Sequence, residues 1–226
     1  MRASEALNAV IRRERVWLDL AVLRLYSHPG FPSVFTEFLV QVYHGMHTAA
    51  ALMEAARTRS ADLASTCPVA ARLVPYWDDH IREEAGHDEW LLADMRRLGM
   101  DVDGVLSAPP SPEVAELMGT LHFWILHTHP VAAIGYFYFV ERNVANVKTI
   151  DHMARVVGIP PTALETFRRH ATIDIAHGRE LEELVDSLPL TTAHRDLLAV
   201  STATVIHQLG RRTEELLLRA EQSTVS

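Results

Sequence analysis

Apolar residues recur at intervals of three and four positions along nearly the whole chain. No stretch alternates apolar and polar residues for long enough to form a half-buried strand. Intervals of three and four place side chains on one face of an α-helix, whereas strands require a period of two. The pattern therefore predicts an all-α protein.

Proline and glycine residues interrupt this pattern at several points and divide it into seven segments. The predicted helices span 3–26, 32–59, 68–99, 112–127, 130–157, 161–187 and 191–221. The Pro-rich stretch 98–112 is the longest break, and we interpret it as a surface loop inside one bundle. We therefore expect a single helical domain over residues 1–226.

Composition supports an ordinary globular protein, because 48% of the 226 residues are hydrophobic and 22% are charged. The formal net charge is −8, and the basic residues are scattered rather than clustered. Nucleic acid is therefore not expected as a partner. The 13 histidines change the picture, because histidine is the commonest metal ligand.

The chain has one cysteine, Cys67, which excludes an internal disulfide and a zinc site built from several cysteines. Charges interrupt the N-terminal stretch where a signal peptide needs an apolar run, and no apolar window reaches the length of a membrane span. We therefore expect a cytoplasmic protein that does not associate with membranes.

A first candidate metal motif lies in the predicted helix 68–99. Glu84 and His87 are three positions apart, so both side chains reach a common point on one helix face. Glu-x-x-His is the motif with which helical bundles hold pairs of iron or manganese ions. Such pairs also occur by chance on solvated helix faces, so this motif alone does not identify a metal site.

A second candidate is a stripe on the predicted helix 161–187. His170, Asp174 and His177 occupy positions i, i+4 and i+7 of one helix face. Apolar neighbours such as Ile173 and Ile175 argue against a fully solvated face. A buried carboxylate between two imidazoles is costly without a cation. The alternative is an exposed or internally paired His-Asp-His cluster.

Glu141 is the third candidate, because it is a single carboxylate within a long apolar and aromatic run. Such a charge needs a partner, either a metal ion or an arginine on another helix. Together, Glu84, His87, Glu141, His170, Asp174 and His177 supply three carboxylates and three imidazoles. Two metal ions would balance their charge.

Over residues 30–190 these motifs resemble the haem-oxygenase-like di-iron oxidases and oxygenases, whose fold is a seven-helix bundle. Glu84 and His87 match the family's Glu and His of the first core helix, and Glu141 matches the Glu of the second. His170, Asp174 and His177 match the third helix of the family at every position. Three motifs in the right order are more specific than any one alone.

The resemblance implies a non-haem centre of two Fe ions (Fe2+/Fe3+) with these six residues as metal-binding and catalytic groups. It also implies O2 as co-substrate, an external electron donor and a small organic substrate that is amino-acid-like, an amine or fatty-acid-like. Natural-product or other secondary metabolism is the typical setting of the family. Apolar residues on the outer helices also make a homodimer reasonable.

Further residues are candidates for the surroundings of the metals. His80 lies one turn before Glu84. It is a candidate for an additional ligand, for a hydrogen-bond partner of a carboxylate, and for the substrate pocket. Phe137 and Tyr138 precede Glu141 by one turn and are expected in the wall of a substrate pocket, although core packing explains them equally well. The arginines considered for binding a substrate carboxylate are Arg142, Arg168 and Arg169, each of which also suits a surface ion pair.

Other functions remain open at the level of sequence. A haem or tetrapyrrole protein of the same fold would use His28 as axial ligand, but carboxylates at the iron face disfavour it. A ferritin-like iron-binding bundle would require a further inward Glu. A thiaminase-like hydrolase would use Cys67, which has no obvious base beside it in the sequence. A purely structural or regulatory protein would leave the six residues exposed.

Overall fold

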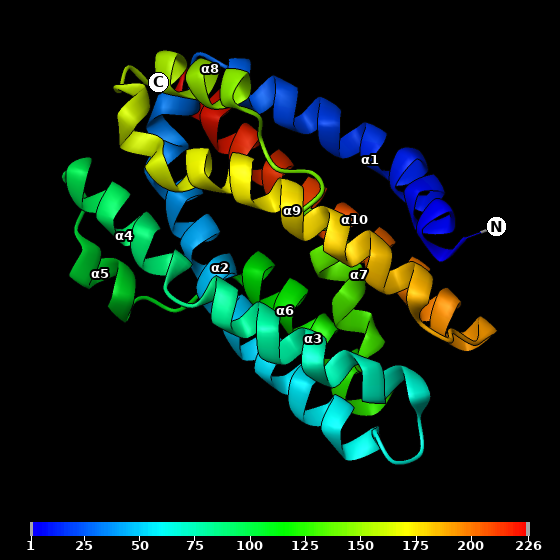
Figure 1. Cartoon of the computed structure of the whole chain (residues 1–226). Coiled ribbons are helices and arrows are strands. Elements are labelled where there is room, and N and C mark those ends of the chain that lie inside the picture. Colours follow the sequence, from blue (N-terminus) through cyan, green and yellow to red (C-terminus); the bar gives the residue numbers. More distant parts are fainter. Residues whose placement is uncertain (1, 225–226) are drawn as a thin grey trace.

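The computed structural model describes residues 2–224, which form a bundle of α-helices (Figure 1). The described residues contain no strand, which confirms the all-α prediction. The helices are α1 (Ala3–Ser27), α2 (Phe31–Leu63), α3 (Pro68–Glu84), α4 (His87–Arg97), α5 (Val102–Ser107), α6 (Pro112–His127), α7 (Val131–Val140), α8 (Val147–Val157), α9 (Glu165–Ser187) and α10 (Thr192–Ser223), with a 3-10 turn η1 (Pro161–Leu164) before α9.

The helices are more numerous than the seven predicted, because helical segments are broken where the apolar pattern continues. The segment 68–99 is two helices, α3 and α4, joined by Ala85 and Gly86. Gly86 has a φ of 83°, a left-handed conformation that glycine adopts without steric cost. The predicted loop 98–112 also differs, since it contains the short helix α5.

The segment 130–157 is likewise two helices. α7 ends at Val140, and Glu141 is its C-cap residue. A non-helical link follows, and α8 begins where the side-chain oxygen of Asn146 accepts a hydrogen bond of 3.1 Å from the Thr149 backbone N–H. Asparagine is a favourable N-cap because it satisfies a free backbone donor of the first turn. The break places Glu141 at a helix end rather than in mid-helix.

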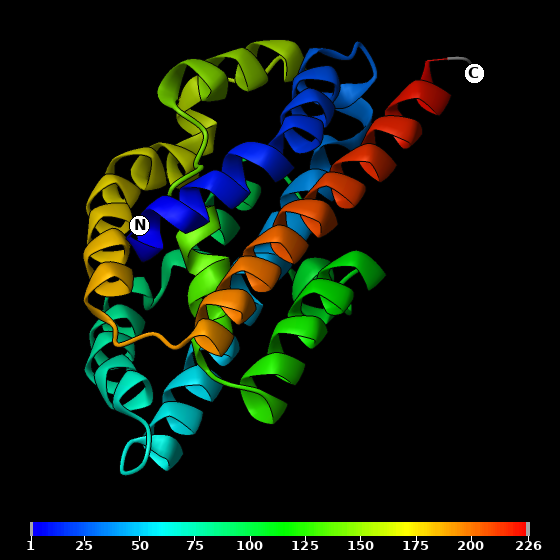
Figure 2. The same ribbon diagram turned by 90° about the vertical axis from the view of Figure 1, so that its right-hand side faces the viewer.

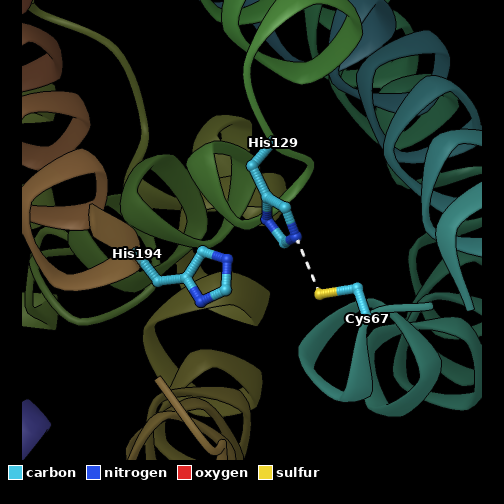
Figure 3. A group of neighbouring side chains, drawn as sticks. All are labelled: Cys67, His129 and His194. Atoms are coloured by element: carbon cyan, nitrogen blue, oxygen red, sulfur yellow. Dashed lines mark hydrogen bonds between the residues drawn. The ribbon is translucent and has the colours of Figure 1, made fainter. Parts of the chain in front are cut away.

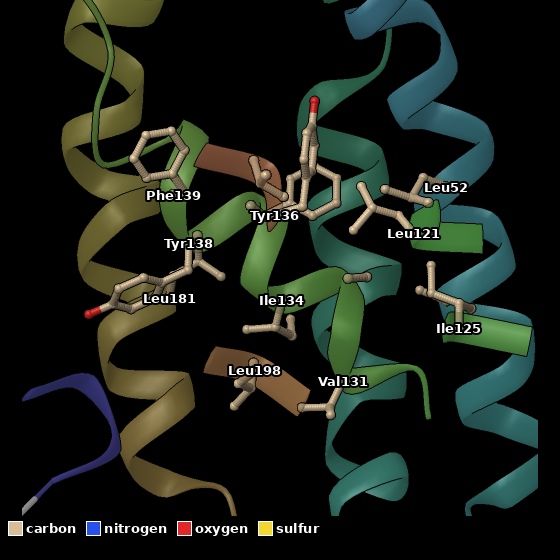
Figure 4. Close-up of a cluster of buried hydrophobic side chains, with 14 of the residues drawn as sticks. Leu52, Leu121, Ile125, Val131, Ile134, Tyr136, Tyr138, Phe139, Leu181 and Leu198 are labelled. Carbon is tan, nitrogen blue, oxygen red and sulfur yellow. The ribbon is translucent and has the colours of Figure 1, made fainter. Parts of the chain in front are cut away.

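α7 crosses the middle of the bundle and is buried along almost its whole length (Figure 2). Its side chains contact neighbouring helices on all sides, including Leu121 and Ile125 of α6 and Leu198 of α10 (Figure 4). A Cβ atom on Gly135 would lie 2.9 Å from Ser201, so glycine permits the close approach of α7 to α10. This packing fixes Glu141 at the centre of the molecule.

α7 is the most apolar helix, but it has 10 residues, far fewer than a bilayer requires. Among the helices described, none combines the length and the hydropathy needed to cross a membrane.

Candidate metal centre

The predicted donor residues come from four helices that meet around the end of α7. His80 and Glu84 lie on α3, and His87 is the first residue of α4. The side chains of His170, Asp174 and His177 extend from α9, which packs against both α4 and α7. We refer to His80, Glu84, His87, Glu141, His170, Asp174 and His177 as the donor set.

Glu84 and His87 lie close together, although not for the reason expected from one continuous helix. They lie on either side of the left-handed Gly86, at the end of α3 and the start of α4. The Nδ1 atom of His87 is nevertheless 2.9 Å from Oε2 of Glu84. The helix break therefore brings a carboxylate and an imidazole together where one chain segment ends and the next begins.

Contacts between helices connect the rest of the donor set. Nε2 of His80 lies 2.9 Å from Oε1 of Glu141. Nδ1 of His177 lies 3.4 Å from Oε1 of Glu84 and 4.0 Å from Oδ1 of Asp174. Residues from three separate parts of the sequence thus share one small volume.

Two groups within this volume have ligand atoms that all lie within 4.8 Å of one another. One group is Glu84, His87 and His170, and the other is His80, Glu83 and His177. Sequence reasoning did not select Glu83, and its side chain is 47% exposed. Its only sequence signal is that it precedes Glu84. Each group offers carboxylate and imidazole atoms close enough together to share one cation.

The three carboxylates of the donor set interact unfavourably without a cation. Burial, followed by the charges of Glu141 and Glu84, raises the pKa of Asp174 to about 8. Burial also raises the pKa of Glu141. Burial opposes ionisation of Glu84 as well, but the hydrogen bond with His87 and the charges of the neighbouring histidines together outweigh it and lower the pKa of Glu84. A bound cation would remove the penalty at Asp174 and Glu141.

Several buried polar atoms of the donor set have no hydrogen-bond partner among the described residues. They are Oε2 of Glu141, Oδ1 of Asp174 and Nδ1 of His177, whereas Nε2 of His80 faces Oε1 of Glu141 at 2.9 Å. Buried polar atoms are normally satisfied, and an unpaired one costs about 1–3 kcal/mol. These atoms are carboxylate oxygens and imidazole nitrogens, the ligands that iron accepts. The residues present therefore fit a metal centre.

His170 is oriented in the manner of a metal ligand. Its Nδ1 atom lies 2.9 Å from the backbone oxygen of Thr166. A carbonyl oxygen only accepts hydrogen bonds, so the ring proton sits on Nδ1 and the lone pair of Nε2 is free. Metal-binding histidines commonly have this arrangement, because the second hydrogen bond fixes both the tautomer and the direction of the ring.

A cavity of about 800 Å³ opens beside the donor set. Five donor-set residues lie in its wall: Glu84, His87, Glu141, His170 and Asp174. Most of the remaining wall is apolar, from residues such as Leu18, Met53, Leu117 and Phe167. A cavity of this size is large enough to hold a drug-sized molecule.

The three predicted pocket residues have different positions, and His80 is not among those that line the cavity. Phe137 lines the cavity, but Tyr138 is not in its wall. The hydroxyl of Tyr138 instead donates a hydrogen bond of 3.2 Å to Oδ1 of Asn8, and its ring lies 4.8 Å below the guanidinium of Arg142. The placement of Tyr138 in the pocket wall was therefore wrong, because this residue faces α1.

The three arginines considered for a substrate carboxylate are held by other protein groups. Arg142 donates to the backbone oxygen of Gly178 and to Glu182, at 2.7 and 2.8 Å. Arg168 pairs with Asp151. Arg169 pairs with Glu165 at 3.1 Å and lies over the ring of Trp90. These ion pairs match the alternative interpretation given for all three.

A second cluster of ligand-type side chains lies away from this cavity. Cys67, His129 and His194 approach one another, with Sγ of Cys67 3.4 Å from Nε2 of His129 (Figure 3). We refer to these three residues as the Cys67 group. The expectation that Cys67 has no base beside it was therefore wrong, because the fold brings in a histidine from the α6–α7 link.

His129 is nevertheless poorly suited to activate Cys67. Its Nδ1 atom accepts a hydrogen bond of 3.1 Å from the Val131 backbone N–H, so in the neutral ring the proton is on Nε2. Nε2 then donates to the sulfur instead of accepting its proton. Burial, followed by the charges of His194 and Arg59, lowers the pKa of His129 to about 4. A thiol nucleophile activated by this histidine is therefore disfavoured.

Comparison with known proteins identifies the family of the chain and agrees with its fold. A family described as iron-containing redox enzymes matches residues 36–209. That range contains every residue of the donor set. A search of curated proteins found no match.

Solved structures resemble the chain along nearly its whole length. A domain of unknown function with a haem-oxygenase-like fold from Shewanella denitrificans OS217 has a TM-score of 0.72 at 17% identity, covering 98% of this chain and 91% of its own. A TenA homologue from Pseudomonas syringae pv. tomato DC3000 has a TM-score of 0.65 at 14% identity, with coverages of 95% and 92%. A TenA homologue from P. horikoshii OT3 has a TM-score of 0.63 at 13% identity, with coverages of 97% and 100%. The bundle therefore has the haem-oxygenase-like fold.

Proposed function

The chain belongs to the family of iron-containing redox enzymes, and from this membership and its donor set we propose that it is a non-haem di-iron, O2-dependent oxidoreductase. Its substrate would be a small organic molecule, and an external donor would supply electrons. The observation that carries the proposal is the group of buried, unpaired carboxylate and imidazole atoms at the end of α7.

The residues proposed to hold the metals are Glu84, His87, Glu141, His170, Asp174 and His177. When bound, iron would supply the one-electron redox chemistry that the reduction of O2 requires. His80 contacts Glu141 at 2.9 Å and is proposed to orient that carboxylate.

The protein's own groups support this chemistry in two ways. Thr166 fixes the direction of His170 through its backbone oxygen, so the imidazole needs no reorganisation when a metal arrives. The apolar wall of the cavity, including Phe137, keeps water away from a substrate held beside Glu141 and Asp174. Asp174 holds a proton at neutral pH in the metal-free protein and releases it when a cation enters.

The tetrapyrrole alternative has less support. His28 is not among the residues that line the cavity, and its Nδ1 atom accepts a hydrogen bond of 3.0 Å from the Gly30 backbone N–H. The cavity wall instead carries the three carboxylates of the donor set, which suit bare metal ions better than a porphyrin face.

The test is an anaerobic titration of the metal-free protein with Fe(II), followed by exposure to O2. We expect close to two irons per chain and O2 consumption that needs iron and a reductant. A ratio near zero, together with a sharp Soret band on adding haemin, would contradict the proposal and favour a tetrapyrrole protein.

A further inference from the structure

The cavity beside the donor set contains a cation that has no acidic partner. Arg212 of α10 lines the cavity and is half-buried. Among the residues described, no carboxylate lies within 4.0 Å of its guanidinium. The other arginine of the cavity wall, Arg15, is by contrast held by Asp19 at 2.8 Å and Asn143 at 2.6 Å.

Two phenol hydroxyls accompany Arg212. Tyr26 of α1 and Tyr136 of α7 both line the cavity, and each interacts electrostatically with the guanidinium. In the described part of the chain, neither hydroxyl has a protein hydrogen-bond partner. Figure 4 shows the hydroxyl of Tyr136 directed away from the apolar side chains around it. Three hydrogen-bond donors thus face the same space without an acceptor.

The position of Arg212 is unfavourable without an anion. Burial lowers its pKa, and the carboxylate that opposes this effect is Glu113 of α6, which forms no ion pair with it. A charged group in such a place is normally paired. Paired arginine–carboxylate contacts are among the strongest hydrogen bonds in proteins, because they are charged and often bidentate.

Arg212 and the donor set occupy different parts of the same cavity. Arg212 lies on α10, which packs against α1, α2, α6 and α7, whereas the donor set lies on α3, α4 and α9 and at the end of α7. Tyr136 lies on α7, the helix that packs against α10 and ends at Glu141, so it connects the two regions. The wall that joins them is largely apolar.

We propose that Arg212, together with the hydroxyls of Tyr26 and Tyr136, binds a carboxylate of the substrate. The apolar part of the substrate then extends along the cavity, and its reacting atom lies near Glu141 and Asp174. The substrate class is therefore an apolar monocarboxylic acid that reacts at a carbon remote from the carboxylate. This inference rests on the proposed function, because it names the substrate class of the same cavity.

The test compares ligands that differ only in their polar end. Isothermal titration calorimetry is performed with 4-phenylbutanoate, the corresponding alcohol and the corresponding amine, and with octanoate and octanol. Both the metal-free protein and the iron-loaded protein under nitrogen are used. We expect each acid to bind at least about tenfold more tightly than its alcohol, and the amine to bind no better than the alcohol.

Substitutions in the cavity wall test which residues bind the carboxylate of the ligand. Arg212→Met is expected to weaken acid binding by about 10- to 100-fold and to leave alcohol binding unchanged. Tyr136→Phe and Tyr26→Phe are each expected to weaken acid binding by about 2- to 10-fold. The matched control is Arg211→Met, since Arg211 is exposed and pairs with Glu116 on the surface. This control is expected to change neither affinity.

Three outcomes would overturn the proposal. One is equal affinity of acid and alcohol in the unaltered protein, and another is unchanged acid binding in Arg212→Met. The third is acid binding that disappears with the iron but not with Arg212, which would place the carboxylate at the metals. If Arg212→Met does not fold, the double variant Tyr26→Phe, Tyr136→Phe replaces it. Unchanged acid binding in that double variant would then overturn the proposal. Arg212-dependent binding in a protein that takes up no iron would refute the proposed function and leave this inference standing.

Discussion

The donor set and the Cys67 group both bring metal-ligating side chains together, but their histidines are hydrogen-bonded in opposite directions. Nδ1 of His170 donates to a backbone carbonyl, which leaves Nε2 free to bind a metal. Nδ1 of His129 and of His194 instead accepts from a backbone N–H, at 3.1 and 3.3 Å. Their protons are then on Nε2, where a ligand would need its lone pair. Proximity of ligand types is therefore not sufficient for a metal site.

The two regions also differ in charge. The donor set contains three carboxylates, and some of their buried oxygens have no partner. The Cys67 group contains no carboxylate. A cation would therefore relieve repulsion at the donor set, whereas at the Cys67 group it would have to displace existing hydrogen bonds.

The largest expected effect follows from His170→Ala. This substitution removes one imidazole ligand, so we expect iron content to fall well below that of the unaltered protein and O2-dependent turnover to drop at least about 100-fold. Metal analysis and anaerobic Fe(II) titration measure the first effect, and O2 consumption measures the second.

The matched control for this substitution is His122→Ala. His122 also places its Nδ1 atom 2.9 Å from the carbonyl oxygen four residues earlier, but it lies outside the donor set. The His122→Ala variant should therefore retain full iron content. Equal iron content in both variants would remove His170 from the ligands.

The next effect concerns stability in the metal-free protein. The pKa of Asp174 is about 8 in the folded state, against about 4 for an ordinary aspartate. Between these values the folded protein holds a proton that the unfolded chain has lost, so stability falls as pH rises from about 4 to about 8. A change of one pKa unit corresponds to about 1.4 kcal/mol, so the loss in the free energy of unfolding reaches several kcal/mol at most.

Asp174→Asn should remove most of this pH dependence in the metal-free protein. Chemical denaturation of both proteins across the pH range measures it. Saturating iron should also weaken the dependence, because a cation replaces the proton. The difference in stability between the unaltered protein and Asp174→Asn isolates Asp174, and a difference that does not fall from pH 4 to pH 8 would contradict the raised pKa of this residue.

A smaller effect is expected from Gly86→Ala. Nothing lies within 4 Å of a Cβ atom at this position, so the cost comes from the left-handed φ of 83° alone. We expect a loss of about 1–2 kcal/mol in the free energy of unfolding and weaker iron binding, because Glu84 and His87 flank this residue. Gly119→Ala in α6 also meets open space but has no left-handed φ, and it should slightly stabilise the protein.

The smallest effect is expected from Cys67→Ser. The hydroxyl keeps an acceptor for His129, so stability should change by less than about 1 kcal/mol. Iron content should not change, and equilibrium dialysis against Zn2+ should find the same number of bound ions in both proteins. Loss of one zinc ion in the variant would show that the Cys67 group does bind a metal.

The sequence was sufficient to predict helices whose ends coincide with proline or glycine. The predicted span 112–127 matches α6 at both ends, because Pro112 and the stretch around His127 mark its limits. The break at Gly86 could not be predicted, since a single glycine within a helical pattern is usually tolerated. Only the packing of α4 against α9 and α2 decides that the chain turns there.

The sequence also identified the donor residues that form short local motifs. Glu84 with His87, and Asp174 with His177, are recognisable because three positions separate each pair. Arg212 and Tyr26 have no such signal, because their significance comes from a cavity formed by distant helices. Tyr138 was misplaced because the buried α7 has neighbours on all sides, so closeness to Glu141 in the sequence does not decide which side chain borders the cavity.

The contact between Glu84 and His177 also bears on how the protein folds and unfolds. These residues lie in distant parts of the chain, yet they approach to 3.4 Å. Such a site can form only after the long chain segment between them has closed, which is slow compared with helix formation. Metal would therefore bind late in folding. We expect bound metal to slow unfolding and to leave the rate of folding almost unchanged.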